Sequence, residues 1–403
     1  MAFSESGRAL VRPEKLRPGY DVVIIGGGGH GLAAAHYLAH DHGIHNVAVL
    51  EAGTIGRGNS GRNTAIVRSN YLTPEGVALY RESMNLWRDL PAALDINLLF
   101  SERGHLTLAH TEGTLRTMRW RAGVNQVLGV DSELVDRDDV ARLCPALDLD
   151  CGGRRPILGA LYHRPGAIVA HDAVVWGFAR SAMRAGVEIH GNTRVLGFDV
   201  RGGRVVGVET SRGYVGANRV LSAVAGSTPR ITKLAGVRTP IVVHPLQACI
   251  SEPMQPWLDP IIVSASLHAY VSQDVRGTLV MGAALDGYEL HAPRSTFDFL
   301  EDLSSAMLDL FPRLAETRIV RQWAGIADMT PDFSPIMGKT PVEFFYLDAG
   351  WGTWGFKATP ISGKTLAHTV AHDRAPSLIE PFRLSRFAEF GLIGEKAAAS
   401  VGH

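Results

Sequence analysis

The chain has 403 residues, which is long enough for two domains or one large domain. Its hydrophobic content of 46% and its charged content of 20% are typical of an ordinary globular protein. Lysine and arginine together number 40 and are balanced by 40 aspartate and glutamate residues, so the composition indicates no surface for nucleic acid or for an anionic membrane. We therefore expect neither as a partner.

The cysteines and the apolar pattern of the chain give no sign of a disulfide-rich, secreted or membrane-spanning protein. Cys144, Cys151 and Cys249 lie far apart and form no CxxC pair, so neither a disulfide framework nor a metal site is expected. Residues 1–20 contain no apolar segment typical of a secretion signal, and no apolar run approaches the roughly 18 residues of a membrane-spanning helix. We expect a cytoplasmic protein whose first 20 residues form a polar arm.

The first predicted elements after this arm form a βαβ unit. An apolar strand leads into Gly26-x-Gly28-x-x-Gly31, an Ala/Leu-rich helix follows, and a second apolar strand ends at Glu51. Glycines in this spacing permit a tight turn and a close approach of the backbone to a pyrophosphate, and the helix N-terminus attracts the phosphates. Glu51 is placed to accept hydrogen bonds from a ribose diol. The unit predicts a dinucleotide site at its first turn.

Helix and strand patterns alternate over the rest of the chain. The predicted segments are a helix at 74–90, a hairpin at 99–111, helices within 112–143, a helix at 171–186, strands and hairpins over 187–226, short strands and one helix over 237–322, and a closing strand, glycine-rich turn and helix over 344–373. Asp172 is expected to cap the helix that starts near 171. The histidine-rich segment 36–45 predicts a solvated helix end rather than a metal site, because it lacks paired ligand spacing.

A nucleotide signature opens the chain and a second glycine-rich strand–turn–helix closes it, which is typical of a flavoprotein with a split nucleotide domain. Three segments, 21–51, RGNSGRNTAIVR at 57–68 and GWGTWGFKATPISG at 350–363, resemble the D-amino-acid oxidase-type FAD family. The resemblance implies an α/β fold, in which a glutathione-reductase-like, Rossmann-type FAD-binding domain is interleaved with a mixed-sheet α+β substrate domain. The implied FAD-binding parts are 21–90, 152–236 and 322–403, and the implied substrate or interface parts are 91–151 and 237–321.

The resemblance also implies which residues hold FAD. They lie in the opening glycine turn, in the loop that follows it, in a later strand and in the closing turn: Gly26, Gly28, Gly29, His30, Gly31, Glu51, Asn59, Ser60, Thr64, Ile66, Val195, Gly352, Thr353, Gly355 and Lys357. His30 is expected to act through its backbone. The helix that begins near Pro360 is expected to aim its N-terminus at the flavin. Proline suits the first turn of a helix, because the backbone N–H that it lacks has no partner within the helix there.

Within this family, GNSGRN at 58–63 and GAIVAHDAVVWGFAR at 166–180 are similar to the beta subunits of heterotetrameric sarcosine oxidases. That branch implies sarcosine as substrate. Arg68, as a planar paired donor, and Lys357, as a point charge, are then expected to bind its carboxylate. Without the resemblance, both residues have ordinary readings as surface or turn cations.

Two departures from single-chain relatives shape the cofactor prediction. Met329 or a neighbour stands where those enzymes attach FAD through cysteine, so non-covalent FAD is expected. Met281 stands in the strand where they use a lysine to activate oxygen. The resemblance implies a covalent FMN on His171, with His163 as the competing residue, and Arg62, Asn63 and Arg321 around the FMN phosphate.

The resemblance implies that electrons pass from sarcosine to FAD, then to FMN, and finally to O2, which gives H2O2. Glycine forms together with formaldehyde or methylenetetrahydrofolate. The implied partners are alpha, gamma and delta subunits, with NAD and tetrahydrofolate bound mainly by those chains. Two alternatives stay open: a single-flavin D-amino-acid or glycine-type dehydrogenase that feeds quinone at a membrane, and a non-catalytic assembly subunit that holds FAD as a structural group.

Overall fold

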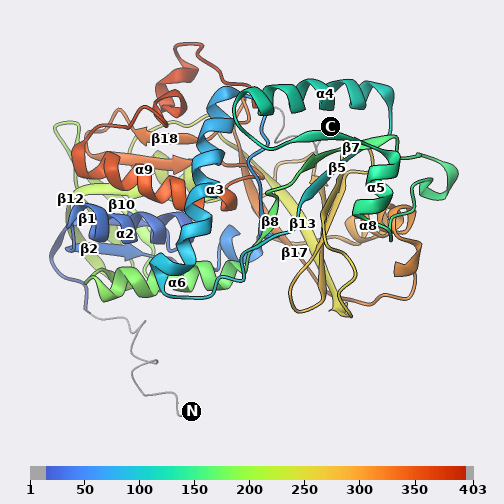
Figure 1. The fold of residues 1–403 in the computed structure, drawn as a ribbon. Helices are drawn as coiled ribbons and strands as arrows, with labels where there is room; N and C mark the ends of the chain where they lie inside the picture. The colour runs from blue at the N-terminus through green and yellow to red at the C-terminus, as the bar shows by residue number, and fades with distance from the viewer. Residues whose placement is uncertain (1–14, 396–403) are drawn as a thin grey trace.

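The computed structural model describes residues 15–395 and has two parts side by side, each built on its own sheet (Figure 1). The first sheet has the strand order β10-β11-β12-β1-β2-β9, with β19 paired to β12 and β18 paired to β19. Strands β19, β12, β1, β2 and β9 run parallel. Its strands are β1 (Gly19–Ile25), β2 (Val47–Leu50), β9 (Glu188–His190), β10 (Val195–Arg201), β11 (Arg204–Thr210), β12 (Gly213–Ser222), β18 (Ile336–Lys339) and β19 (Phe345–Ala349).

Helices α2 (Gly29–His42), α6 (His171–Arg184) and α9 (Thr359–His372) cover one side of this sheet, and α3 (Pro74–Leu94) packs on α9 and α6 (Figure 1). Helix α2 packs between α6 and α9. A Cβ atom at Gly363 would lie only 2.4 Å from Ala33 Cβ, so glycine is required where α9 crosses α2. The parallel strands, the glycine-started α2 and this layer of helices confirm the predicted Rossmann-type fold.

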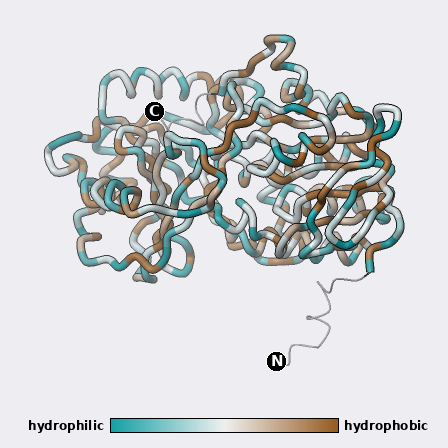
Figure 2. The backbone as a smooth tube through the Cα atoms, turned by 180° about the vertical axis from the view of Figure 1, so that it is seen from behind, coloured by the Kyte–Doolittle hydropathy of each residue, from teal (hydrophilic) through white to brown (hydrophobic). Residues whose placement is uncertain are grey.

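The second part is an antiparallel-rich sheet with the order β17-β13-β16-β15-β14-β5-β7-β6. Its strands are β5 (His105–Ala109), β6 (Glu133–Asp136), β7 (Gly159–His163), β13 (Val242–Pro253), β14 (Ile261–Ser264), β15 (Ala269–Gln273), β16 (Thr278–Leu285) and β17 (Ile319–Met329). Its helices are α4 (Glu112–Val127), α5 (Arg137–Leu143) and α8 (Phe297–Leu310). Figure 2 shows hydrophobic stretches in both parts, and each part buries its own apolar cluster.

Short elements join the two parts. A small sheet in the order β3-β8-β4 lies between them, with β3 (Ile66–Val67), β4 (Ser101–Glu102) and β8 (Ala167–Ile168). The remaining elements are α7 (Thr228–Leu234), η1 (Asn59–Arg62), η2 (Cys151–Gly153), η3 (Ala225–Ser227), η4 (Pro312–Leu314), η5 (Phe356–Ala358), η6 (Glu380–Phe382) and η7 (Leu384–Phe387).

The predicted hairpin at 99–111 is wrong. Strand β4 pairs with β8 in the small sheet, whereas β5 pairs with β7 and β14 in the large one. Gly104 explains the switch, since it has a φ of +83° and both it and Arg103 donate backbone hydrogen bonds to Gly166 O. The chain therefore leaves one sheet and enters the other at this glycine.

Two further expectations need adjustment. The segment 112–143 contains a strand, β6, between its two helices. The domain boundary expected at 322 divides β17, and the FAD-binding part expected from 152 contains β7, although both strands belong to the second sheet. Of the expected arm, residues 1–14 lie outside the described residues, while Arg17 pairs with Glu188 and Gly19 opens β1.

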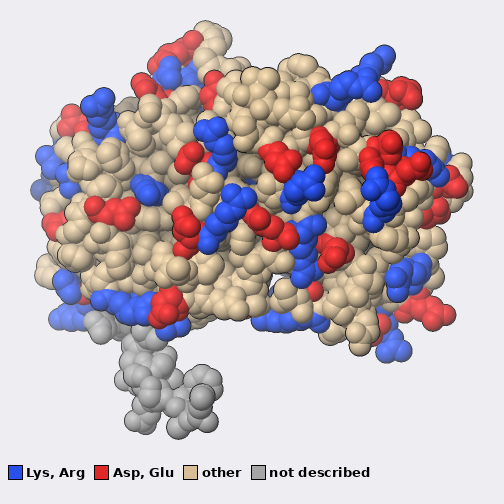
Figure 3. Space-filling view, viewed as in Figure 1, with Lys and Arg blue, Asp and Glu red and all other residues tan. Residues whose placement is uncertain are grey.

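Positive and negative side chains are interspersed over the face of the molecule shown in Figure 3. Within residues 15–395, the structure contains no helix that is both long and apolar enough to cross a membrane.

Candidate active site

A cavity of about 690 Å³ lies between the two sheets. Its walls come from the glycine turn after β1, the end of β2, the η1 loop, strands β5, β15 and β17, and the turn before α9. Of the predicted cofactor and substrate residues, those that line it are Gly26, Gly28, Gly29, His30, Glu51, Asn59, Ser60, Arg62, Asn63, Thr64, Ile66, Arg68, Val195, Gly352, Thr353, Gly355 and Lys357. Gly31, His171 and Arg321 lie outside this lining.

The glycine turn is held open by backbone geometry. Gly26 has a φ of +112°, and a Cβ atom there would lie 2.3 Å from Ala223 O. Gly31 does not line the cavity, but a Cβ atom there would lie 2.1 Å from Gly26 O, so its role is to let α2 start close to β1. The free N–H groups at the start of α2 therefore face the cavity, where they suit a phosphate group.

Glu51 and the η1 loop position this turn. The Glu51 carboxylate accepts hydrogen bonds from Gly27 N at 2.9 Å and from Gly53 N at 2.8 Å. Ser60 Oγ accepts from Gly29 N at 2.9 Å. The predicted loop residue Asn59 instead clamps the backbone of Ile326, accepting from its N–H and donating to its carbonyl oxygen. Asn59 thus fixes the loop against β17.

The two glycine-rich ends of the chain are joined by the side chain of His30. Its Nδ1 lies 2.8 Å from an Asp348 carboxylate oxygen, and its Nε2 donates to Gly355 O at 2.8 Å. Burial alone would lower the pKa of His30, but Asp348 outweighs burial and the pKa is raised. The Trp351 ring stands edge-on to His30 at 4.9 Å between centroids. The ring of His30 therefore joins α2 to the closing turn, and sequence reasoning missed its partner Asp348.

Lys357 and Arg68 are brought together from distant segments. Lys357 is only 9% exposed, and its carbonyl oxygen accepts from Ser83 Oγ and Trp87 Nε1, which fixes the turn at η5. Burial, and secondly the charge of Arg68, hold the pKa of Lys357 well below its ordinary value. Arg68 donates to Asn70 and lies over the Tyr71 ring at 4.5 Å. Two cationic groups thus face one cavity that can accept a carboxylate.

Sequence reasoning missed several other residues of the cavity wall. His105 and Thr107 are two apart on β5 and both face the cavity, as strand alternation requires. Burial keeps the pKa of His105 well below its ordinary value, so its imidazole is neutral. Burial raises the pKa of Asp328 to about 7. Buried polar residues within the apolar strand HLTLA were the signal that could have identified β5 as a site strand.

The sulfur-containing residues lie as follows. Met329 lines the cavity. Cys144, Cys151 and Cys249 are buried elsewhere, and none of them is among the lining residues. Met281 is buried in β16 and also lies outside the lining. Among the described residues that line the cavity, Lys357 is the one lysine.

A second, smaller cavity of about 130 Å³ lies beside His171. Asn63 and Thr64 line both cavities, so the two sites share one loop. His171 is the first residue of α6 and its side chain is 34% exposed, with Nδ1 3.8 Å from the Asp172 carboxylate. The prediction that Asp172 caps α6 is wrong. The helix begins at His171, so Ala170 occupies the N-cap position and Asp172 lies within the first turn. Burial lowers the pKa of His171, which favours a neutral ring.

Cationic side chains lie around the η1 loop, although Arg62 and Arg321 are not among the described residues that line the second cavity. Burial, and then the nearby charges of Arg57 and Arg321, lower the pKa of Arg62. Arg321 is exposed on β17, and the Arg62 carbonyl accepts from Trp323 Nε1 on the same strand. Helix α6 packs against η1. Arg62, Asn63 and Arg321 are thus gathered on one loop and its neighbouring strand.

His163 has a different environment from His171. It is fully buried in β7, its Nδ1 donates to Asp131 O at 2.7 Å, and its Nε2 accepts from Ser69 N at 3.2 Å. Burial lowers the pKa of His163 to about 3. Both ring nitrogens are therefore engaged within the protein, so His163 is a structural histidine.

Comparisons with known proteins agree with this architecture. The family model "FAD dependent oxidoreductase" matches residues 21–369. The chain is 47% identical to a sarcosine oxidase subunit beta of Arthrobacter sp over 384 residues, 95% of each chain, and 45% identical to that of Rhizobium meliloti, covering 94% of this chain and 91% of the relative. Its structure is similar to that of L-proline dehydrogenase from P. horikoshii, with a TM-score of 0.86, 26% identity, and 93% and 99% of the two chains covered.

Proposed function

Because the chain belongs to the FAD-dependent oxidoreductase family and, within it, to the sarcosine oxidase beta subunits, we propose that it oxidises sarcosine at a non-covalently bound FAD. The observation that carries the proposal is that Lys357 and Arg68 line the same cavity as the glycine turn. The other residues of that cavity fit the two ends of the same cofactor.

The residues that line the large cavity support FAD binding. In this proposal the N-terminus of α2 would hold the pyrophosphate, Glu51 at the end of β2 the ribose, and Val195 the adenine. Helix α9 begins at Thr359 with Pro360 in its first turn, so its positive end lies just beyond Lys357. The absence of cysteine from the described lining supports non-covalent binding.

Sarcosine needs its carboxylate fixed so that its methyl group faces the flavin. FAD, when bound, supplies the acceptor for the hydride equivalent. Arg68, held by Asn70 and by the Tyr71 ring, offers a planar donor pair, and Lys357 offers a point charge. The negative charge of an incoming carboxylate favours the protonated form of the Lys357 amine. Substrate binding therefore restores the charge on Lys357 that burial disfavours. The neutral ring of His105 adds no competing charge.

We further propose that His171 carries FMN through a covalent bond to its ring, with Arg62, Asn63 and Arg321 around the phosphate. The partly exposed, neutral imidazole at the start of α6 is suited to act as a nucleophile. Pockets that enclose a cofactor are about 300–1,000 Å³, so the 130 Å³ cavity covers only part of a flavin. A partner chain would cover the rest.

In this proposal, the FMN site would be where O2 is reduced to H2O2. Sarcosine would yield glycine with formaldehyde or methylenetetrahydrofolate. The alpha, gamma and delta subunits would complete the assembly and hold NAD and tetrahydrofolate. The beta-subunit naming of the relatives supports a multi-chain oxidase.

Anaerobic addition of sarcosine to the assembled protein tests the oxidation step. We expect the flavin absorbance to bleach with sarcosine and to stay unchanged with glycine, which lacks the N-methyl group. No bleaching with any secondary amine would contradict the proposal and favour a non-catalytic assembly subunit. Rapid reoxidation by quinone but not by oxygen would instead indicate the single-flavin dehydrogenase.

A further inference from the structure

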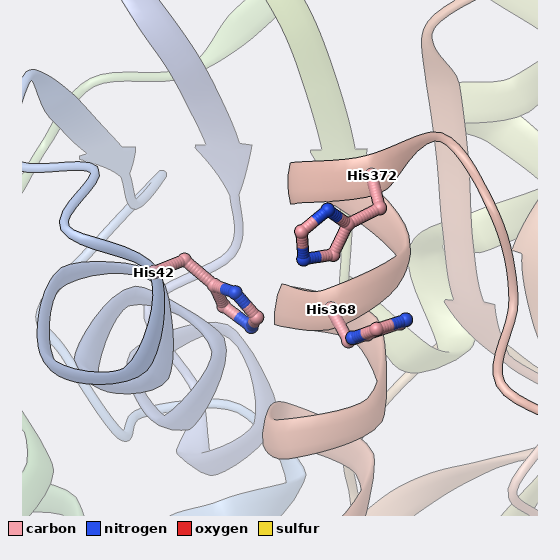
Figure 4. Close-up of side chains that lie close together, drawn as sticks. All are labelled: His42, His368 and His372. Carbon is pink, nitrogen blue, oxygen red and sulfur yellow. The ribbon is translucent and has the colours of Figure 1, made fainter.

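We propose that His42, His368 and His372 bind a divalent transition-metal ion of the zinc class. These residues are called the three-histidine cluster here. One ring nitrogen of each residue lies within 4.8 Å of the corresponding nitrogens of the other two. Figure 4 shows the three rings gathered between the ends of two helices.

Helix geometry places these three imidazoles on one side of a shared gap. His368 and His372 are four residues apart on α9, so they share one face, and their ring centroids are 4.5 Å apart. The His42 ring comes from α2 and lies 5.2 Å from that of His372 and 5.8 Å from that of His368. A histidine pair at this spacing plus a third imidazole is a common ligand set for zinc.

The rings need only a small movement to ligate. Metal–nitrogen bonds of about 2.0–2.1 Å in a tetrahedral site place the nitrogens about 3.4 Å apart. The three rings can reach this spacing by rotation of their side chains. None of them is enclosed by the protein, since His42 and His368 are half-buried and His372 is exposed. The remaining coordination position is open to water.

The surrounding backbone also favours a cation. His42 is the last residue of α2 and His372 is the last residue of α9, so two helix C-termini meet at the cluster. Each helix C-terminus carries a partial negative charge. Asp41 adds an acidic neighbour to His42, and Arg374 is a cationic neighbour of His368. The two helix ends and Asp41 therefore favour a cation at the cluster, whereas Arg374 opposes it.

For the segment 36–45 alone, the sequence predicts a solvated helix end without metal-site geometry. His42 does end α2, but its two partners come from α9, more than 300 residues later in the chain. Sequence spacing within one segment could not reveal a ligand set that the α2–α9 packing assembles.

A bound ion would join the two helices that carry the cofactor site. Both α2 and α9 start at the large cavity, and each has 14 residues, or about 21 Å of length. The cluster therefore lies at the far ends of these helices, away from Lys357 and the glycine turn. Its expected effect is on resistance to unfolding, with little effect on sarcosine turnover.

The test uses the full-length chain, without a histidine tag, after removal of metals by a chelator. We expect one Zn²⁺ per chain by equilibrium dialysis, and a rise in the thermal midpoint of about 3 °C or more with Zn²⁺ but not with Mg²⁺. The His368→Ala/His372→Ala double variant should lose both effects. His291→Ala, which removes an exposed histidine from the second part of the molecule, should keep both.

Cobalt provides an independent readout of geometry. Co²⁺ added to the metal-free chain should give the intense visible bands of four-coordinate cobalt, and His42→Ala should abolish them. Absence of Zn²⁺ uptake by the unmodified chain would overturn the proposal. So would uptake and stabilisation that persist undiminished in the double variant, because the ion would then bind elsewhere.

Discussion

Replacing Lys357 with methionine is expected to lower kcat/KM for sarcosine by about 10²–10³-fold while the FAD content stays near one per chain. Lys357 is buried, lines the large cavity and lies near Arg68, and the proposed function places both at the substrate carboxylate. Methionine keeps the apolar stem and removes the charge that pairs with the carboxylate. Burial already disfavours the protonated form of the Lys357 amine, so replacing this amine with a methionine side chain should not destabilise the fold.

The matched control for this variant is Lys364→Met. Lys364 lies on α9, is exposed, and contacts the Tyr37 ring at 6.0 Å. Steady-state kinetics and flavin content of both variants should be measured side by side. Near-normal kcat/KM in Lys357→Met would remove Lys357 from the site, and an equal loss in both variants would show that the effect is not specific to Lys357.

Replacing Arg386 with methionine is expected to lower the free energy of unfolding by about 3–5 kcal/mol. Arg386 is fully buried, and it donates to both carboxylate oxygens of Asp332, from Nε at 2.8 Å and from Nη2 at 2.9 Å. The variant would leave Asp332 buried without its countercharge. Asp332 belongs to the loop that follows Met329, so this pair ties the C-terminal segment to the cavity wall.

Chemical denaturation measures this loss, and a double variant separates charge from packing. Arg386→Met/Asp332→Leu should recover much of the stability, because replacing both partners removes the unpaired charge. Arg383→Met breaks an exposed pair with Glu389 and should change little. If Arg386→Met were as stable as the unmodified chain, the buried pair would make no net contribution to the free energy of unfolding.

The same pair predicts a pH dependence. Burial alone would raise the pKa of Asp332, but Arg386 outweighs burial, so the pKa lies below its ordinary value. A carboxyl whose pKa is depressed on folding stabilises the folded state above its ordinary pKa, and this contribution is lost as the pH falls through the lower folded value. The unmodified chain should therefore lose more stability on acidification than the double variant does.

The opening βαβ unit could be predicted from local sequence because its requirements are local. The glycine spacing, the two apolar strands and Glu51 are set within 31 residues, and the structure contains the predicted strand, glycine turn, helix and second strand. Only the family resemblance predicts that Lys357 and Arg68 share one site, since nothing in the sequence near either residue indicates the other.

Features made by contacts between distant segments could not be predicted. The Asp348 partner of His30 comes from a strand more than 300 residues away, and the three-histidine cluster depends on the packing of α2 on α9. The hairpin prediction failed at Gly104 because a single backbone conformation decides which sheet the next strand joins. Local patterns determine the elements, whereas side-chain partners depend on how the sheets and helices pack.

The proposed function places two flavins on one chain, an exchangeable FAD in the large cavity and an FMN bonded to His171. Acid precipitation of the chain, purified with its partner chains, tests it directly through the flavin absorbance of pellet and supernatant. We expect FAD in the supernatant and one FMN fixed in the pellet, and His171→Ala should leave the pellet colourless. Release of every flavin from the unmodified protein would contradict the claim and leave a single-flavin enzyme.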